Sequence, residues 1–256
     1  MKIVESVANL ADLRRTRGPG TTGFVPTMGA LHDGHLSLLA RARAGNDRAW
    51  ASIFVNPAQF NEPADLATYP RPLEDDLAKL RAAGCDLVFL PRAKDMYPDH
   101  YRYRVTENDL SQRFCGADRP GHFDGVLTVV LKLLMLVRPD RAYFGEKDYQ
   151  QLRLVEGMVR AFFLDTEIVA CPILREPDGL AMSSRNRLLK PADRARAPDF
   201  HRLLAESVAG GRSADEAGGA LARAGFDVEY VADHEERRLA AVRLGQVRLI
   251  DNVECA

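Results

Sequence analysis

Short runs of β-branched and aromatic residues alternate with longer amphipathic stretches along the first two-thirds of the chain. The short runs predict strands, and apolar residues at three- and four-residue steps predict helices. Such alternation is typical of a mostly parallel sheet that helices cover on both faces. The expected strands are residues 23–26, 50–56, 87–91, 142–145 and 167–174, and the expected helices are residues 36–44, 74–83, 126–137 and 149–163.

The pattern changes after residue 174. A charged, turn-rich break at residues 175–179 precedes a helix that Pro191 opens, and alanine-rich helical stretches follow. Two short strands are expected at residues 227–231 and 246–250. The sequence therefore predicts an α/β fold: a Rossmann-like parallel sheet with helices on both faces in residues 1–174, and a smaller α+β C-terminal domain in residues 175–256.

Composition and charge exclude several classes of protein. The chain has 256 residues, with 35 Lys and Arg against 36 Asp and Glu, and this balance argues against a dedicated nucleic-acid binder. The longest apolar stretch, residues 126–137, is too short to cross a membrane, and the N-terminus lacks the pattern of a secretory signal. The four cysteines form no C-x-x-C pair, as is usual for reduced thiols in the cytoplasm, where we expect the protein to reside.

The segment PTMGALHDGHLSLL (residues 26–39) joins an expected strand to an expected helix. Backbone N–H groups at such a helix start, with the positive end of the helix dipole, favour a phosphate group. His32 and His35 are three residues apart and so face the same side of a helical turn. Two imidazoles there can donate hydrogen bonds to phosphate oxygens and stabilise negative charge that develops at phosphorus.

Two later segments carry positive charge at similar places. In YFGEKDYQQ (residues 143–151), a strand runs into a glycine and then a helix start, so Lys147 is placed as a compact cation for phosphate. Asp148 either binds ribose hydroxyls or caps the helix. In DGLAMSSRNR (residues 178–187), two hydroxyls and Arg185 on a mobile loop can wrap a triphosphate; alone, this string also fits a helix N-cap.

Neutral amides offer a different kind of contact. Gln59 in FVNPAQF (residues 54–60) follows the second strand, and Gln151 lies on the first turn of a helix. An amide both donates and accepts, which suits a small hydroxy acid. The run Glu74-Asp75-Asp76 fits either a Mg²⁺ site or an acidic helix start.

These segments together resemble the pantothenate synthetase (pantoate–β-alanine ligase) family of the nucleotidyltransferase superfamily. The resemblance is dense over residues 20–190 and rests on the four quoted strings and on RPGHFDGVLTVVLKL (residues 119–133); RLIDN (residues 248–252) is its clearest C-terminal part. It implies ATP-dependent condensation of (R)-pantoate with β-alanine through a pantoyl adenylate, with Mg²⁺, in a homodimer. From composition and charge we expect this protein to be cytoplasmic and to bind no nucleic acid and no membrane.

The resemblance also implies roles for individual residues. It makes His35, His32, Lys147 and Arg185 catalytic, Gln59 and Gln151 the clamp for pantoate, and Asp75 and Asp76 candidate metal ligands, although Lys79 stands where relatives have a neutral amide. The residues expected at ATP are Met28, Gly29, Ala30, Leu31, His32, Asp33, Gly34, His35, Gly145, Glu146, Lys147, Asp148, Leu174, Met182, Ser183, Ser184 and Arg185.

Two other functions fit parts of the pattern. A nucleotidyltransferase with a phosphorylated acceptor would call for more Arg and Lys than the paired glutamines supply. A catalytically silent nucleotide sensor would release no pyrophosphate when it is given pantoate and ATP without β-alanine, whereas the ligase would release one burst.

Overall fold

A computed structural model of the chain describes residues 1–61 and 63–255. Contacts divide the chain into two compact units. Unit 1 comprises Met1–Gly145 and Gln150–Cys171, and unit 2 comprises Glu146–Tyr149 and Pro172–Ala256. The division therefore begins unit 2 three residues before the expected boundary and adds a short segment, Glu146–Tyr149, to it. The independent domains 1–174 and 175–256 stay a prediction.

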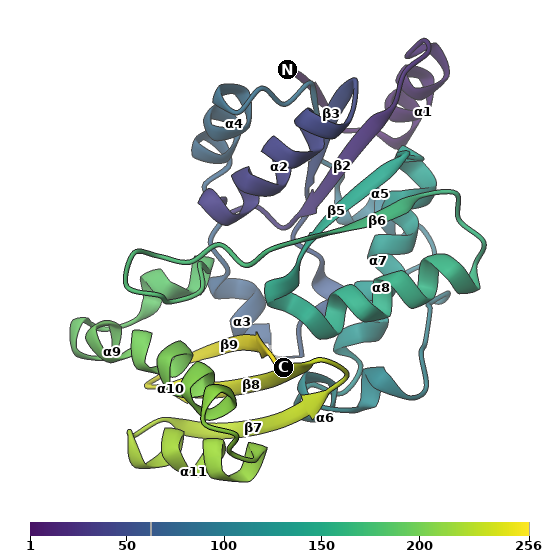
Figure 1. Cartoon of the computed structure of the whole chain (residues 1–256). Coiled ribbons are helices and arrows are strands. Elements are labelled where there is room, and N and C mark those ends of the chain that lie inside the picture. The colour runs from purple at the N-terminus through teal and green to yellow at the C-terminus, as the bar shows by residue number, and fades with distance from the viewer. Residues whose placement is uncertain (62, 256) are drawn as a thin grey trace. The chain divides into compact units, whose positions relative to one another are not determined.

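Unit 1 is built on a six-stranded sheet in the order β1-β4-β3-β2-β5-β6, in which all pairs are parallel. The strand order reverses between β2 and β5, so the carboxyl ends of these neighbours mark the switch point where such sheets bind ligands. Figure 1 labels four of the six strands, β3, β2, β5 and β6, which lie side by side. The six strands are β1 (Lys2–Val4), β2 (Thr22–Thr27), β3 (Arg48–Ile53), β4 (Leu87–Phe89), β5 (Arg141–Gly145) and β6 (Glu167–Cys171).

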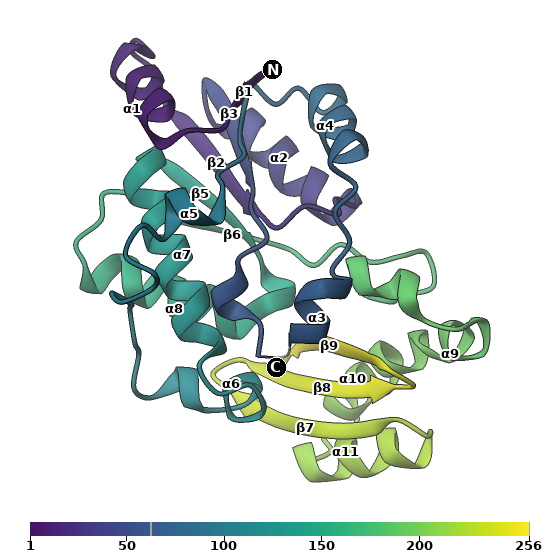
Figure 2. The same cartoon turned by 180° about the vertical axis from the view of Figure 1, so that it is seen from behind.

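Helices cover both faces of this sheet. Helix α2 (Asp33–Gly45) lies in front of it in Figure 1, and α7 (His122–Val137) lies in front in Figure 2, which shows the opposite side. Strand β2 is buried at five of its six positions, as expected for a strand covered on both faces. The other helical segments of the first part of the chain are α1 (Val7–Thr16), η1 (Pro57–Gln59), α3 (Pro63–Thr68), α4 (Leu73–Ala82), α5 (Ala93–Met96), η2 (Leu110–Gln112), α6 (Cys115–Asp118) and α8 (Tyr149–Ala161).

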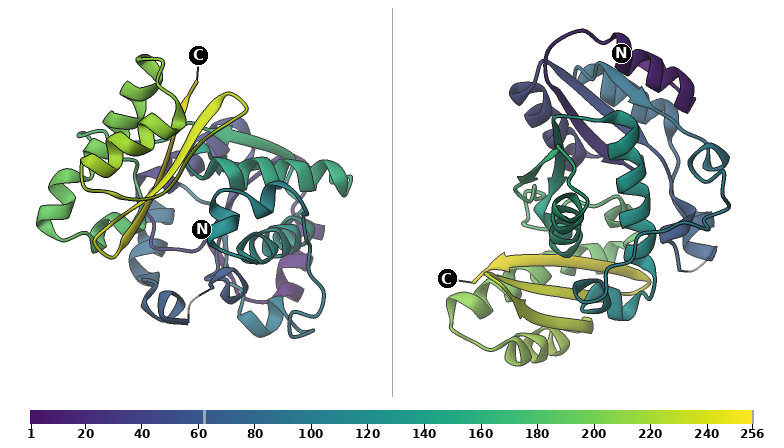
Figure 3. Two further views of the ribbon diagram at one scale, coloured as in Figure 1. Left: turned by 90° about the horizontal axis from the view of Figure 1, so that it is seen from below. Right: turned by 90° about the vertical axis from the view of Figure 1, so that its right-hand side faces the viewer.

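Unit 2 has a three-stranded antiparallel sheet in the order β7-β8-β9. Helices α10 and α11 lie along one face of it, as Figure 3 shows, and Phe200, Leu204 and Leu221 from these helices pack on Val242 and Leu249 of the sheet. The elements are η3 (Glu146–Asp148), η4 (Ser184–Leu188), α9 (Pro191–Arg196), α10 (Pro198–Ala209), α11 (Ala214–Arg223), β7 (Asp227–His234), β8 (Arg237–Leu244) and β9 (Val247–Glu254).

The predicted fold class is confirmed, with differences in detail. The structure adds two strands that the sequence did not predict, β1 and β8, and it ends β3 and β6 three residues earlier than expected. Among the described residues, no helix combines the length and the hydrophobicity that a bilayer crossing requires.

Candidate functional site

The loop after β2 is held by the buried carboxylate of Asp76. Asp76 is 1% exposed, and its two oxygens accept hydrogen bonds from the backbone of Ala30 (2.8 Å) and Leu31 (2.7 Å). Gly29 has a φ of 80°, and a Cβ atom there would lie 2.8 Å from an Asp76 oxygen. Only glycine therefore fits this close approach without displacing the carboxylate.

The backbone conformation of Ala30 shows that contacts with α4 stabilise a loop shape that the chain would otherwise disfavour. Its φ of 51° lies in the left-handed region, which costs a residue with a side chain about 1 kcal/mol or more. The hydrogen bond to Asp76 stabilises this conformation, and Lys79 adds a second contact by donating to the Leu31 carbonyl (2.9 Å). Helix α4 thus fixes the shape of the loop that leads into α2.

The two histidines cap the N-terminus of α2. His32 is the N-cap residue, and its Nδ1 accepts from the backbone of Gly34 at 3.2 Å. Nδ1 of His35 accepts in turn from the backbone N–H of His32 at 3.4 Å, which forms a reciprocal capping box. The ring centroids are 4.1 Å apart. The structure therefore brings together these two predicted residues.

This capping fixes which ring nitrogen carries the proton. A nitrogen that accepts a hydrogen bond has no proton, so the neutral rings of His32 and His35 are protonated at Nε2. Both Nε2–H groups are donors, at a helix N-terminus whose dipole attracts anions. The arrangement suits a phosphate group without requiring a charged imidazole.

Gln59 is oriented by neighbours on three segments of unit 1. Its Oε1 accepts from Asn56 at 3.0 Å, and its Nε2 lies 3.2 Å from the Sδ atom of Met28. Its backbone carbonyl contacts Nδ1 of His122 at 2.8 Å.

Asn56 is the residue that connects Gln59 to the rest of unit 1. It is 1% exposed, and besides Gln59 it donates to the carbonyl of Gly125 (3.1 Å) and accepts from the Tyr97 hydroxyl (2.6 Å). Burial raises the pKa of Tyr97, which keeps this hydroxyl a donor. A Cβ atom at Gly125 would lie 2.3 Å from the Ala58 carbonyl oxygen, so glycine is needed for α7 to approach this segment.

The two neighbouring glutamines of α8 differ in their surroundings. Gln150 is 6% exposed and fully engaged: its oxygen accepts from the backbone of Cys115, and its nitrogen donates to the carbonyls of Leu110 and Arg113. Gln151 is half-buried. Gln150 thus serves the fold, and a role of Gln151 at a ligand stays a prediction.

In unit 2, strand β9 holds the Glu146–Tyr149 segment. The Asn252 amide donates to the carbonyls of Glu146 (2.8 Å) and Lys147 (3.3 Å). Arg237 pairs with the Glu146 carboxylate at 2.9 Å, and its guanidinium lies over the Tyr149 ring. The Lys147 ammonium lies 3.9 Å from the Asp148 carboxylate and is about one-fifth exposed.

The segment from Leu174 to Arg185 folds back on itself within unit 2. Backbone pairing joins Arg175 to Ala181, and the Met182 N–H donates to the Leu174 carbonyl at 3.0 Å, so two predicted ATP residues are adjacent. The Ser183 hydroxyl caps η4 by accepting from the backbone of Arg185 at 3.2 Å. The helix-cap alternative for this string therefore describes its local structure, and its mobility stays a prediction.

The buried carboxylate of Asp251 contacts this loop. Asp251 accepts from both terminal nitrogens of Arg175 at 2.7 and 3.0 Å, and Nδ1 of His201 lies 3.3 Å away. Burial would raise the pKa of Asp251, but the contacts with His201 and Arg175 and the charge of Arg175 outweigh it, so this pKa is lowered. Asp251 is therefore a carboxylate at neutral pH.

The candidate metal ligands do not fit a direct metal site as they are placed. Both oxygens of Asp76 accept backbone N–H groups, and Asp75 pairs with Lys79 at 2.7 Å. Within residues 1–61 and 63–255, no three His, Cys, Asp or Glu side chains form a group that could hold a metal ion. The acidic helix start describes these residues better, and the role of Mg²⁺ stays a prediction.

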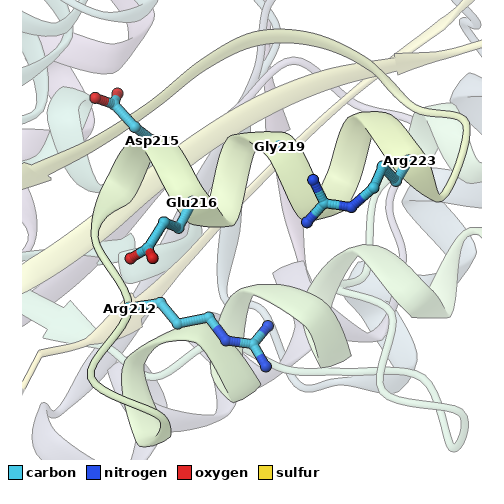
Figure 4. A pocket seen from close by; sticks show the side chains of 5 residues that line it. All are labelled: Arg212, Asp215, Glu216, Gly219 and Arg223. Carbon is cyan, nitrogen blue, oxygen red and sulfur yellow. The ribbon is translucent and has the colours of Figure 1, made fainter.

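Unit 2 also has a surface depression, which none of the candidate site residues lines. Figure 4 shows its lining along α11 and the turn before it: two cations, two anions and a glycine, namely Arg212, Arg223, Asp215, Glu216 and Gly219. Glu216 is already engaged in the capping box of Ser213. The balanced charges favour neither an anionic nor a cationic ligand.

The fold and these loops define a class of α/β protein. In this class, loops with polar and charged side chains follow the strands of a parallel sheet, and a helix capped by histidines begins at the switch point. Comparison with known proteins gives the family. The family profile described as pantoate-beta-alanine ligase matches residues 2–254, and the chain belongs to this family of enzymes.

Curated relatives and solved structures agree with this assignment. The chain is 54% identical to pantothenate synthetase of Bdellovibrio bacteriovorus, over 94% of both chains, and 47% identical to that of Coxiella burnetii, over 100% of this chain and 97% of the relative. The crystal structure of the Thermus thermophilus enzyme has a TM-score of 0.91 at 45% identity, covering 100% and 99% of the two chains. That of Francisella tularensis pantoate-beta-alanine ligase, complexed with beta-gamma ATP and beta-alanine, has a TM-score of 0.91 at 39% identity, covering 99% and 97%.

Sequence reasoning missed several residues that shape the candidate site. Asn56, Arg237 and Asn252 were not candidate site residues, and each holds a predicted site segment through hydrogen bonds. Asp76 was a candidate metal ligand, but its contact with the loop after β2 was not expected. For Asn252 a signal existed, because it lies in the RLIDN string that resembles the family. The roles of the predicted site residues themselves stay predictions.

Proposed function

We propose that this protein condenses (R)-pantoate with β-alanine to form pantothenate at the expense of ATP, which is released as AMP and pyrophosphate. The observation that carries the proposal is the reciprocal capping of α2 by His32 and His35, in a chain that belongs to the pantoate-beta-alanine ligase family. A related structure in complex with an ATP compound and beta-alanine supports the choice of substrates.

The first step forms pantoyl adenylate. A carboxylate oxygen of pantoate attacks the α-phosphorus of ATP, the bond from this phosphorus to the bridging oxygen breaks, and pyrophosphate leaves. The substrate itself is the nucleophile, so the protein has to position two anions and neutralise the charge that develops. Nε2–H groups of His32 and His35 would donate to phosphate oxygens, and Lys147 and Arg185 would supply positive charge.

The second step forms the amide. The β-alanine amine attacks the acyl carbon of the adenylate, the bond from this carbon to the AMP oxygen breaks, and AMP leaves as the nitrogen loses a proton. Neither step needs a serine or cysteine nucleophile. Cys85 is buried, and burial raises the pKa of its thiol to about 12, so this residue is not a thiolate at neutral pH.

We assign ATP the residues named from the sequence. In unit 1 they are residues 28–35, which lead into α2 and form its first turn, and Gly145 at the end of β5; in unit 2 they lie on the Glu146–Tyr149 segment and the 174–185 loop. Mg²⁺ would keep several waters and bind largely through the phosphates of ATP. The cytoplasmic location and the homodimer stay predictions.

Gln59 and Gln151 would hold pantoate, so their replacement should separate the two substrates. In Gln59→Ala and Gln151→Ala, we expect the KM for pantoate to rise about tenfold or more, because each loses hydrogen bonds to a buried polar ligand. The KM for ATP should stay within about twofold. Steady-state kinetics with each substrate varied in turn measure both values.

Gln150→Ala is the matched control, because it removes the adjacent amide. This variant should lower the thermal stability, since Gln150 bonds three backbone groups, but it should not change the KM for pantoate selectively. A selective rise in the KM for ATP in the Gln59 variant would contradict the clamp.

A reaction that lacks β-alanine tests the proposed function itself. ATP and pantoate together should give a rapid release of about one pyrophosphate per enzyme, followed by a slow phase, because the adenylate stays bound. A nucleotide sensor would release none, and an enzyme that uses another acceptor would need that acceptor in place of pantoate. Either result would overturn the proposal.

A further inference from the structure

Two consecutive residues of β9 hold two separate segments of unit 2. Asp251 binds Arg175, whose guanidinium also donates to the Gly179 carbonyl at 3.2 Å. Asn252 binds the backbone carbonyls of Glu146 and Lys147. Successive side chains of a strand point to opposite faces, so one strand position reaches each segment.

Both side chains are almost completely buried, and their polar groups are engaged. The exposed fractions of Asp251 and Asn252 are 3% and 2%. Asn252 uses its amide nitrogen for the two carbonyls and its oxygen to accept from Arg237 at 2.8 Å. Asp251 also accepts from the backbone N–H of Asn252 at 2.8 Å. Neither Asp251 nor Asn252 was among the candidate site residues.

Asn252 contacts the backbone at Lys147. Its two donated hydrogen bonds end on the carbonyls of residues 146 and 147, and Arg237 bridges the Asn252 oxygen to the Glu146 carboxylate. An N–H group of asparagine can satisfy these carbonyls, whereas a carboxylate at the same place would repel them. The amide therefore determines where the Lys147 backbone lies.

We propose that Asp251 and Asn252 are positioning residues, which fix the positions of the 174–185 loop and of the Glu146–Tyr149 segment along β9. The proposal rests on the proposed function, because it assigns the two segments to ATP. Asn252 acts through Lys147, and Asp251 acts through Arg175 on the loop that carries Met182 and Ser183.

A double-mutant cycle between Asn252 and Lys147 tests this. The probe is exchange of pyrophosphate into ATP in the presence of pantoate, which measures adenylate formation. Asn252→Asp keeps the size of the side chain and removes the two donated hydrogen bonds. We expect it to lower kcat/KM for ATP about tenfold to hundredfold, with the KM for pantoate unchanged. In the Lys147→Ala background, the same change should cost less than about threefold, because the effect passes through the lysine.

Leu249→Ala is the control for a general loss of stability. Leu249 lies on the same strand, is 4% exposed and packs in the core of unit 2. Its truncation should lower the melting temperature and leave kcat/KM for ATP within about threefold. If Asn252→Asp does not fold, Arg237→Gln removes the ion pair with Glu146 from a more exposed position and should show the same non-additivity with Lys147→Ala.

The outcomes separate the two proposals. Wild-type exchange in Asn252→Asp, or an equal loss in both backgrounds, would overturn the positioning role while the role of Lys147 stands. Wild-type exchange in Lys147→Ala would overturn the proposed role of Lys147 and, with it, the positioning role of Asn252.

Discussion

Replacement of His35 by alanine is expected to slow adenylate formation about 10²–10³-fold, the usual effect of removing one donor to a developing oxyanion. The donor that we propose is the Nε2–H group. Nδ1 of His35 accepts from the His32 backbone, so the ring proton lies on Nε2. ATP affinity should change little, because this hydrogen bond strengthens mainly in the transition state. Pyrophosphate exchange measures the rate, and equilibrium titration measures ATP binding.

Two amide variants separate capping from donation at His35. An asparagine places its polar atoms near the Nδ1 position and can keep the cap, whereas a glutamine places an N–H near the Nε2 position. We expect His35→Gln to recover part of the lost rate and His35→Asn to retain stability without recovering it. The assigned role is wrong if exchange in His35→Ala stays within a few fold of wild type, or if His35→Asn is the more active variant.

Asp76→Asn is expected to lower the free energy of unfolding by about 2–4 kcal/mol and also to slow adenylate formation. The carboxylate accepts two backbone N–H groups in the interior. An amide can accept only one of them with its oxygen, and its NH₂ group then faces the other N–H, so one buried donor loses its partner. Where the NH₂ group takes the position that faces Ala30, that residue loses the contact that stabilises its left-handed conformation. Urea unfolding and pyrophosphate exchange measure the two effects.

Asp75→Asn is the matched control for this change. Asp75 is the adjacent residue, but its side chain is 55% exposed and its partner is Lys79, so its loss should cost less than about 1 kcal/mol. If Asp76→Asn were as stable as wild type, the loop-anchoring role would be wrong. A higher Mg²⁺ requirement for exchange in Asp75→Asn would support the metal role instead.

The central sheet could be predicted because its signal is local. Buried parallel strands are nearly continuous apolar runs, and the intervening helices show three- and four-residue periodicity, so each element is visible in its own sequence. Strand β1 was missed because it has only three residues at the sheet edge. Strand β8 was missed because its alanines, Ala240 and Ala241, give no β signal; its pairing with β7 and β9 makes it a strand.

The supports of the candidate site could not be predicted, because they depend on contacts between distant parts of the sequence. The sequence around an acidic residue at a helix start does not distinguish a metal ligand from a residue that binds a loop. Only the fold shows that Asp76 accepts hydrogen bonds from Leu31 and Ala30, which lie 45 and 46 positions earlier in the chain. Likewise, chain order places Lys147 directly after β5, and the contact from Asn252, 105 positions away, assigns its segment to unit 2.

Transfer of a labelled oxygen tests most directly whether the pantoate carboxylate attacks the α-phosphorus. Pantoate that carries oxygen-18 in its carboxylate is converted with ATP and β-alanine in a single turnover, and mass spectrometry measures the oxygen-18 content of each product. Attack at the α-phosphorus predicts one labelled oxygen in AMP and none in pyrophosphate. Label in inorganic phosphate with release of ADP, or AMP without label, would contradict an adenylate and the roles proposed here for the two histidines.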